Sequence, residues 1–112
     1  VEERFRTIFN SAAVGIGRVS PDGPFLEVND RYCQILGRSR EEILGGGWAE
    51  ITHPEDLEGD LALVEKALAG EVDSYSYEKR YLAKDGSDIW VNLTVSAERN
   101  PDGSVKFFIP VV

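Results

Sequence analysis

The chain contains one histidine and one cysteine, His53 and Cys33, which are the first candidates for nucleophilic or metal chemistry. A nucleophile needs a base beside it, and no known sequence signature joins these two residues. A structural zinc site needs about four ligands, which one histidine and one cysteine cannot supply without many carboxylates. We therefore expect no enzymatic activity and no metal site, and we interpret Cys33 as a small core residue.

His53 lies in the segment Thr-His-Pro-Glu-Asp, residues 52–56, which has the composition of a helix start. Thr52 and Glu55 have the spacing of a capping box, and Pro54 suits a first helical turn. The acids of this segment favour the positive end of a helix dipole. We expect His53 to belong to this helix start and to point outward.

Lys79 is the other residue with chemical potential, because it alternates with tyrosines. A period of two places Tyr75, Tyr77, Lys79 and Tyr81 on one face of a strand. If that face is buried, the lysine needs a partner or must reach water with its tip. Two interpretations follow: a cation facing a small anionic ligand, or a buried lysine paired with a helix carboxylate. The second is favoured, since lysine stems are readily buried.

Length and composition restrict the class of protein. With 112 residues, of which 42% are hydrophobic, the chain should fold as a single domain. Its net charge of −8 argues against nucleic-acid binding. No apolar run approaches the roughly 20 residues of a membrane span, and the first residues do not resemble a signal peptide. One cysteine cannot form an internal disulfide, so we expect a cytoplasmic location without membrane insertion.

Three Asp-Gly pairs, at residues 22, 85 and 102, separate segments of strand-like composition and predict hairpins. Asn29 is a good helix N-cap, and Gly37 ends that helix. The apolar residues Leu57, Leu61, Val64 and Leu68 predict one buried face of a helix from about Pro54 to Ala69. The expected organisation is a single α+β domain with an amphipathic helix over 1–10, two strands over 14–28, a helical segment over 29–69 and three strands over 74–112.

These elements follow the order found in a known family. The segments FRTIFNSAAVGI, PFLEVNDRYCQILGRSREEILG, WAEITHPEDL, YSYEKRYLAKDGSDIWVNLTVS and ERNPDGSVKFFI resemble a PAS domain with a PAC-type C-terminal half. The resemblance covers almost the whole chain. It implies a five-stranded antiparallel sheet in the order 2-1-5-4-3, with helices packed on one face to close a small pocket. Pro110 departs from the family pattern; because proline lacks an N–H, it should lie where its nitrogen faces away from a partner strand, or at a bulge.

The resemblance also implies which strand faces are inner. The apolar face that carries Val91 and Leu93 is the inner one, and the strand register places Lys79 with it. The residues that we expect to line a pocket are Tyr77, Lys79, Tyr81, Val91, Leu93, Ile35 and Leu36. Gly15 and Gly17 on the first strand predict the close approach of another element, with a docked helix favoured over a ligand.

Cofactors of the family are not expected here. Flavin-binding, light-sensing relatives resemble NCRFLQ, where this chain reads GGGWAEITHPED and has no cysteine. Haem-binding relatives usually offer a histidine from the long helix, and EDLEGDLALVEKALAG contains none. We therefore expect neither haem nor flavin, and at most an unidentified small-molecule ligand.

The outer sheet face is the candidate interface. An exposed tryptophan beside small polar residues is typical of a partner surface, and the first helix needs a dock. The interface candidates are Phe5, Ile8, Phe9, Trp90 and Asn92. The family often dimerises through such a surface, so we expect a homodimer with flanking signalling domains in the parent chain.

The resulting prediction is a non-catalytic sensory or interaction module of a bacterial histidine kinase or diguanylate cyclase. A structural dimerisation domain with a filled core and no ligand is the alternative, favoured by large side chains expected to point inward: Tyr77, Tyr81, Leu93 and Phe107. A small enzyme is a third hypothesis, which the absence of a nucleophile–base pair disfavours.

Overall fold

The computed structural model describes residue 7 and residues 9–112. The helix predicted over 1–10 lies largely outside the described residues, and so do two interface candidates, Phe5 and Ile8. The elements are β1 (Gly17–Val19), β2 (Phe25–Val28), α2 (Asp30–Leu36), α3 (Arg40–Leu44), α4 (Pro54–Leu68), β3 (Ser74–Leu82), β4 (Asp88–Arg99) and β5 (Val105–Val111). Among the described residues, no helix is long and apolar enough to cross a membrane.

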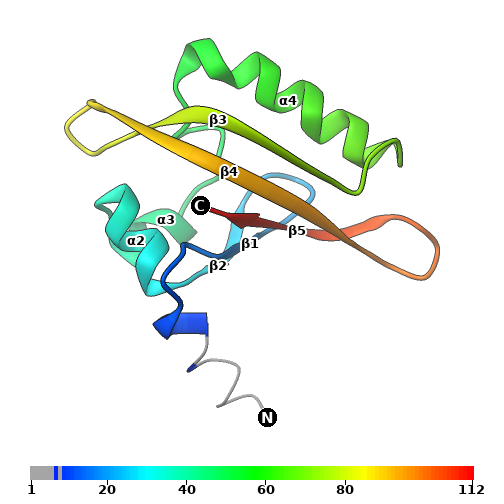
Figure 1. Cartoon of the computed structure of the whole chain (residues 1–112), viewed down its shortest axis with the longest axis horizontal. Coiled ribbons are helices and arrows are strands. Elements are labelled where there is room, and N and C mark those ends of the chain that lie inside the picture. Colours follow the sequence, from blue (N-terminus) through cyan, green and yellow to red (C-terminus); the bar gives the residue numbers. More distant parts are fainter. Residues whose placement is uncertain (1–6, 8) are drawn as a thin grey trace.

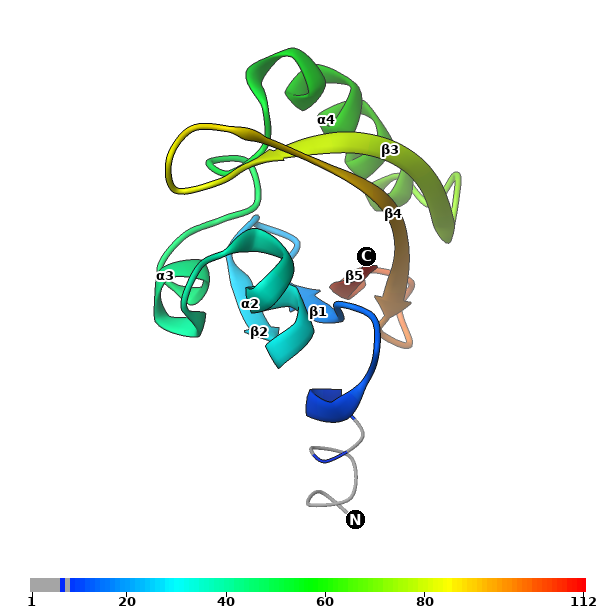
Figure 2. The same cartoon turned by 60° about the vertical axis from the view of Figure 1, so that its left-hand side comes forward.

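The strands form one antiparallel sheet in the order β2-β1-β5-β4-β3, as the family resemblance implied. Helices α2 and α3 lie beside β2, and α4 runs alongside β3 (Figures 1 and 2). Residues from the helices and from the inner sheet face share one hydrophobic core. The Asp-Gly turns work as expected, since Gly86 and Gly103 adopt φ angles of 85° and 91°.

The inner face of β4 is the predicted one. Val91, Leu93 and Val95 are buried, whereas Trp90 is 65% exposed on the other face. On β5 the prediction for Phe107 was wrong. Phe108 is the buried residue and pairs with Ala97, whereas Phe107 lies opposite Glu98 on the outer face, because alternation admits only one of two adjacent phenylalanines.

Pro110 does not interrupt the last strand. It lies in register opposite Val95, and the irregularity in the β4–β5 pairing falls between Glu98 and Arg99 instead. The side chain of Pro110 is buried on the inner face. The bulge that the sequence allowed at this position is therefore absent, and the strand stays regular around the proline.

Asn29 fixes the start of α2 and ties it to the chain before β1. Its Oδ1 accepts from the amides of Ile16 and Tyr32, at 2.9 and 3.0 Å. Its Nδ2 donates to the carbonyls of Phe9 and Val14, at 2.8 and 2.9 Å. The side chain is fully buried, and all four of its hydrogen-bonding positions are used. The predicted N-cap thus also holds tertiary structure together.

Helix α4 begins one residue later than the capping-box prediction required. His53 is the N-cap, and its Nδ1 accepts from the Glu55 amide at 3.1 Å. The hydroxyl of Thr52 is used elsewhere, so the predicted Thr52–Glu55 box was wrong. The interpretation of His53 as part of the helix start is confirmed.

The inner face of α4 is displaced from the predicted leucine stripe. Leu61 and Leu68 are 44% and 46% exposed, whereas Asp60 and Ala67 are buried. Periodicity alone cannot fix the rotation of a helix about its own axis, and here a buried carboxylate decides it.

We predict that Asn29→Ala lowers the free energy of unfolding by about 2–4 kcal/mol, because it removes a helix cap and leaves buried amide and carbonyl groups unpaired. Chemical denaturation measures the change. Ser39→Ala is the matched control, since Ser39 caps α3 in an exposed position. We expect it to cost about 1 kcal/mol. Equal losses in the two variants would contradict the tertiary role of Asn29.

Candidate functional site

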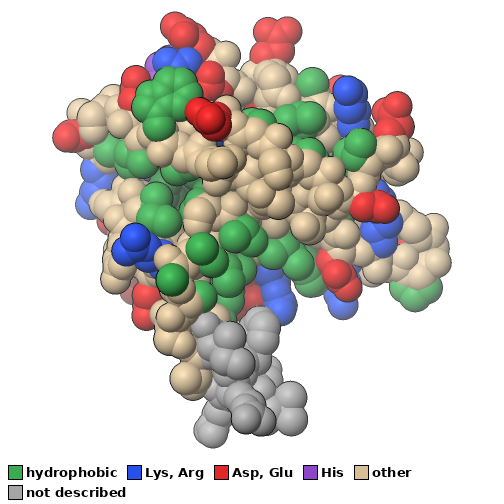
Figure 3. All heavy atoms as spheres, viewed as in Figure 1, with side chains coloured by type: hydrophobic (Ala, Val, Ile, Leu, Met, Phe, Trp, Pro, Cys, Tyr) green, Lys and Arg blue, Asp and Glu red, His purple; other side chains and the backbone are tan. Residues whose placement is uncertain are grey.

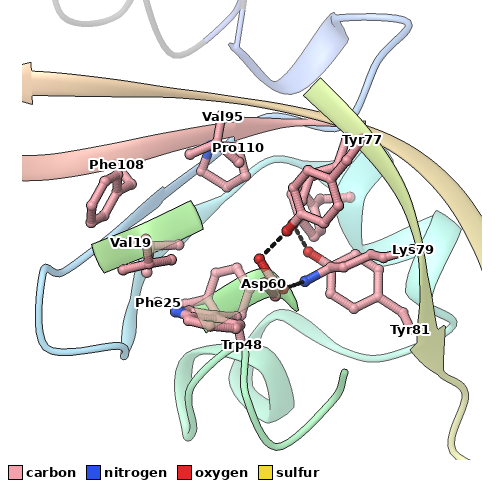
Figure 4. A pocket seen from close by; sticks show the side chains of 13 residues that line it. Val19, Phe25, Trp48, Asp60, Tyr77, Lys79, Tyr81, Val95, Phe108 and Pro110 are labelled. Carbon is pink, nitrogen blue, oxygen red and sulfur yellow. Dashed lines mark hydrogen bonds and ion pairs between the residues drawn. The ribbon is translucent and has the colours of Figure 1, made fainter. Parts of the chain in front are cut away.

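A buried ion pair joins α4 to β3. The Nζ of Lys79 and the hydroxyl of Tyr77 both donate to the Asp60 carboxylate, to Oδ2 and Oδ1 respectively. Lys79 and Asp60 are only 2% and 3% exposed. Figure 4 shows Tyr77 and Lys79 reaching from β3 to the same carboxylate. Of the two interpretations of Lys79, the structure therefore supports pairing with a helix carboxylate over an anion site.

The segment before α4 completes the surroundings of the lysine. Thr52 Oγ1 accepts from Lys79 Nζ at 3.0 Å and donates to the Trp48 carbonyl at 2.7 Å. The ammonium also lies 5.1 Å from the centre of the Trp48 ring and 4.5 Å from that of Tyr81. Aromatic faces at these distances attract a cation. Lys79 is thus held by one carboxylate, one hydroxyl and two rings.

A second polar contact lies beside the ion pair. The hydroxyls of Tyr32 and Tyr81 are 2.6 Å apart, and both side chains are almost wholly buried. The ring of Tyr32 also packs edge-on against that of Phe25. Tyr32 belongs to α2 and Tyr81 to β3, so this pair links the two sides of the core.

Burial dominates the electrostatics of the cluster. It lowers the pKa of Lys79, and the nearby Asp60 carboxylate opposes that shift. Burial also raises the pKa of Tyr77, and its hydrogen bond to Asp60 raises that pKa further. Tyr77 therefore stays neutral at physiological pH and donates a hydrogen bond to the carboxylate.

These polar groups surround a small cavity. Its volume is about 30 Å³, which is room for about two water molecules. It is lined by Val19, Phe25, Tyr32, Trp48, Asp60, Val64, Tyr77, Lys79, Tyr81, Leu93, Val95, Phe108 and Pro110. Most of its wall is apolar, and the Asp60–Lys79 pair forms the charged part.

The structure brings together only some of the pocket candidates. Four line the cavity: Tyr77, Lys79, Tyr81 and Leu93. Val91 and Leu36 are buried in the core but are not among the lining residues. Ile35 is half-buried and also lies outside the lining. Its side chain instead approaches Gly15, where an added Cβ would lie 2.6 Å from Val112 Cγ2, 3.1 Å from Tyr32 Cα and 3.3 Å from Ile35 Cδ1, so α2 approaches this glycine as predicted. At Gly17 the docked-helix prediction was wrong, because the close neighbours belong to β2 and β5.

Sequence reasoning missed the residues that complete the cluster: Asp60, Tyr32, Trp48 and Thr52. An aspartate within a surface helix is usually solvated, and nothing in the periodicity of α4 marks Asp60 as buried. The available signal was the inward-facing lysine itself, which required an anionic partner from a facing helix.

A second ionic contact fixes the beginning of α4 on β3. Arg80 donates from Nε and Nη2 to the two oxygens of Asp56, each at 3.0 Å, and its amide donates to Asp56 Oδ2 at 2.8 Å. The His53 amide donates to the Arg80 carbonyl at 2.9 Å. Hydrogen bonds from the Arg80 side chain lower the pKa of Asp56 from its ordinary 3.8 to about 2.

The outer sheet face presents the remaining interface candidates. Trp90 and Asn92 are exposed there, and the Arg80 guanidinium lies 5.2 Å from the centre of the Trp90 ring. Phe9 is buried in the monomer and does not contribute to this face. Acidic side chains lie mainly toward the periphery of the face in Figure 3, whose centre carries uncharged and hydrophobic side chains. Such a surface suits contact with a protein.

Metal chemistry has no ready site in the described part of the chain. Within residues 7 and 9–112, no three His, Cys, Asp or Glu side chains gather in a group that could hold a metal ion. Cys33 is half-buried against the core, as expected.

The sheet order, the helices on its inner face and the small internal cavity define a sensory-domain fold, and comparison with known proteins gives the family. The family model described as PAS fold matches residues 25–112, so the chain belongs to the PAS family. The crystal structure of the PAS domain of a protein from Colwellia psychrerythraea superposes with a TM-score of 0.86 at 18% identity, covering 98% of this chain and 92% of that one.

Curated relatives place the domain among signalling proteins. The chain is 42% identical over 108 residues to the probable diguanylate cyclase DgcE of Escherichia coli (strain K12), covering 96% of this chain and 10% of that protein. It is 26% identical over 95 residues to the sensor histidine kinase TmoS of Ectopseudomonas mendocina, covering 85% of this chain and 10% of that protein. The chain spans about a tenth of the length of these relatives and is a sensory module of the bacterial signalling type.

We predict that Lys79→Met lowers the free energy of unfolding by about 3–5 kcal/mol, because it leaves the Asp60 carboxylate buried without its cation. Adding Asp60→Leu should recover most of that loss, since a buried ion pair replaced by apolar groups is often tolerated. Urea denaturation of the parent, the two single variants and the double variant gives the interaction free energy between Lys79 and Asp60. Lys84→Met, which breaks an exposed pair with Glu42, is the control and should change little. Strictly additive losses would contradict the pairing.

The Arg80–Asp56 contact predicts a pH dependence. Because the pKa of Asp56 is lowered in the folded state, its contribution to stability is complete above pH about 4 and is lost as the pH falls through about 2. Asp56→Asn should therefore lower the melting temperature at pH 7, and the difference from the parent should close between pH 4 and pH 2. A difference that stays constant over that range would show that Asp56 does not titrate as described.

Proposed function

We propose that the chain is a non-catalytic, cytoplasmic sensory domain of a diguanylate cyclase or histidine kinase, and that its signal acts at the Asp60–Lys79 pair. The observation that carries the proposal is that Asp60 and Lys79, the charged groups among the described residues that line the cavity, also form one of the contacts that hold α4 to β3. A molecule or a packing change in the cavity therefore alters the position of α4 on the sheet.

The mechanism requires two states of different affinity for the signal. In the state described here the ion pair is closed and the cavity has room for about two water molecules. A polar ligand that replaced Lys79 or Tyr77 as the partner of Asp60 would favour a second state with α4 displaced. The motion would reach the outer face through Arg80, which contacts both Asp56 and Trp90.

We propose that the domain works without haem or flavin. Helix α4 carries no histidine, and the two ring nitrogens of His53 face the Glu55 amide and the Asp88 carboxylate, the latter at 3.8 Å. The segment over residues 45–56 offers no cysteine for a flavin adduct.

The second candidate function is a dimerisation domain without a ligand. The small cavity volume favours it, because pockets for organic ligands usually measure about 300–1,000 Å³. In both candidates we propose a homodimer formed through the outer face around Trp90 and Asn92, within a longer chain that carries flanking signalling domains.

Native mass spectrometry of the protein purified from cells tests these proposals together. We expect the mass of a dimer carrying an additional small molecule. Trp90→Ala should give monomers, because a large exposed aromatic is the strongest anchor on that face. Leu26→Ala, at an exposed position on β2, is the control and should remain dimeric.

The possible outcomes separate the candidates. A dimer with no bound molecule, even after enrichment with cell extract, supports the dimerisation domain over the sensor. A monomeric parent protein contradicts the proposed dimer. Turnover of any substrate by the isolated chain contradicts the non-catalytic assignment.

A further inference from the structure

A surface groove lies between α4 and the turn that joins β1 to β2. Its volume is about 410 Å³, and its floor includes Leu61, Val64 and Leu68 from α4 together with Trp48. Leu61 and Leu68 are the two leucines that the rotation of α4 turns away from the core, with exposed fractions of 44% and 46%. We call this surface the α4 groove. Leu61, Val64 and Leu68 follow the i, i+3, i+7 spacing of one helix face, so they form a continuous apolar stripe on α4.

The rim of the α4 groove is acidic. Asp22, Glu50 and Glu65 line it, all three are exposed, and no lysine or arginine is among the lining residues. None of these three carboxylates takes part in the ion pairs found within the described part of the chain. The groove therefore offers an apolar floor bounded by unneutralised negative charge.

This combination selects one kind of occupant. A second copy of the chain seated groove to groove is disfavoured, because it would bring the acidic rims of the two copies together. An amphipathic helix docks in a groove through apolar residues at positions i, i+3, i+4 and i+7, and flanking lysines or arginines would meet the acidic rim. We propose that the α4 groove binds a basic amphipathic helix of a partner segment.

The groove and the internal cavity share a wall. Trp48, Val64 and Phe108 line both, and the Trp48 ring lies 5.1 Å from Lys79 Nζ. A helix seated in the groove would therefore contact the outer side of residues that surround the buried ion pair. The inference is independent of the proposed function, because it requires no ligand in the cavity. The position of Trp48 in the groove also makes its fluorescence a reporter of binding.

The test uses a Trp90→Phe background, which leaves Trp48 as the only tryptophan. The probe is a synthetic leucine–lysine peptide of about 14 residues, with leucine at helical i, i+3, i+4 and i+7 positions and lysine elsewhere. We expect a saturable change in Trp48 emission that weakens as salt is added. A peptide of the same composition in scrambled order should bind at least about tenfold more weakly, since it has no apolar face.

Two substitutions locate the site. Leu61→Gln combined with Leu68→Gln should weaken binding at least about tenfold, equivalent to about 1.4 kcal/mol. Glu65→Lys should weaken it and reduce the salt dependence, whereas Glu58→Lys, on the same helix but outside the groove lining, should leave the affinity within about threefold. Circular dichroism confirms that each variant is folded.

Several results would overturn the proposal. These are the absence of saturable binding, equal binding of the scrambled peptide, equal effects of Glu65→Lys and Glu58→Lys, or full affinity in the double leucine variant. Dimerisation that depends on Leu61 and Leu68 without any peptide would assign the groove to a second copy instead.

Discussion

The buried pair between Asp60 and Lys79 is the interaction on which the arrangement of α4 depends. Removing two charges from water costs several kcal/mol per ion, so a buried pair persists only where other groups complete its hydrogen bonding. Tyr77, Thr52 and the neighbouring rings provide that completion. Such a pair gives little net stability compared with an apolar contact of the same size, but its directional bonds are satisfied only when Asp60 faces the sheet.

Polar contacts tie α4 to the sheet at three points along its length. The Arg80–Asp56 hydrogen bonds hold its first turn on β3, and the Asp60–Lys79 pair holds its middle on β3. The guanidinium of Arg99, on β4, donates to the Ala67 carbonyl near its end at 2.9 Å. Leu61 and Leu68 meanwhile face outward. A helix held by a few directional contacts is suited to move when one of them changes, whereas α2 is anchored by the fully satisfied Asn29.

Much of the fold could be predicted from sequence because its signals are local. Alternation in β4 separated Val91 and Leu93 from Trp90, and Asn29 and Gly37 marked the ends of α2. The strand order came from the family resemblance, since strand pairing between distant segments has no local signature. The cavity could be predicted only in part, because Lys79 showed that a partner was needed without showing which one. Asp60 can be identified as the partner of Lys79 only once the rotation of α4 is known. That rotation is set by tertiary contacts rather than by the leucine stripe.

The central claim is that the Asp60–Lys79 pair holds α4 specifically on the sheet. Amide hydrogen exchange, followed residue by residue in the parent protein and in Lys79→Met, tests it most directly. The account predicts that protection along α4 falls by more than protection in β4 and β5, whose amides exchange by global unfolding and report only the change in global stability. A loss in α4 no greater than that in β4 and β5, or unchanged protection in α4, would contradict it.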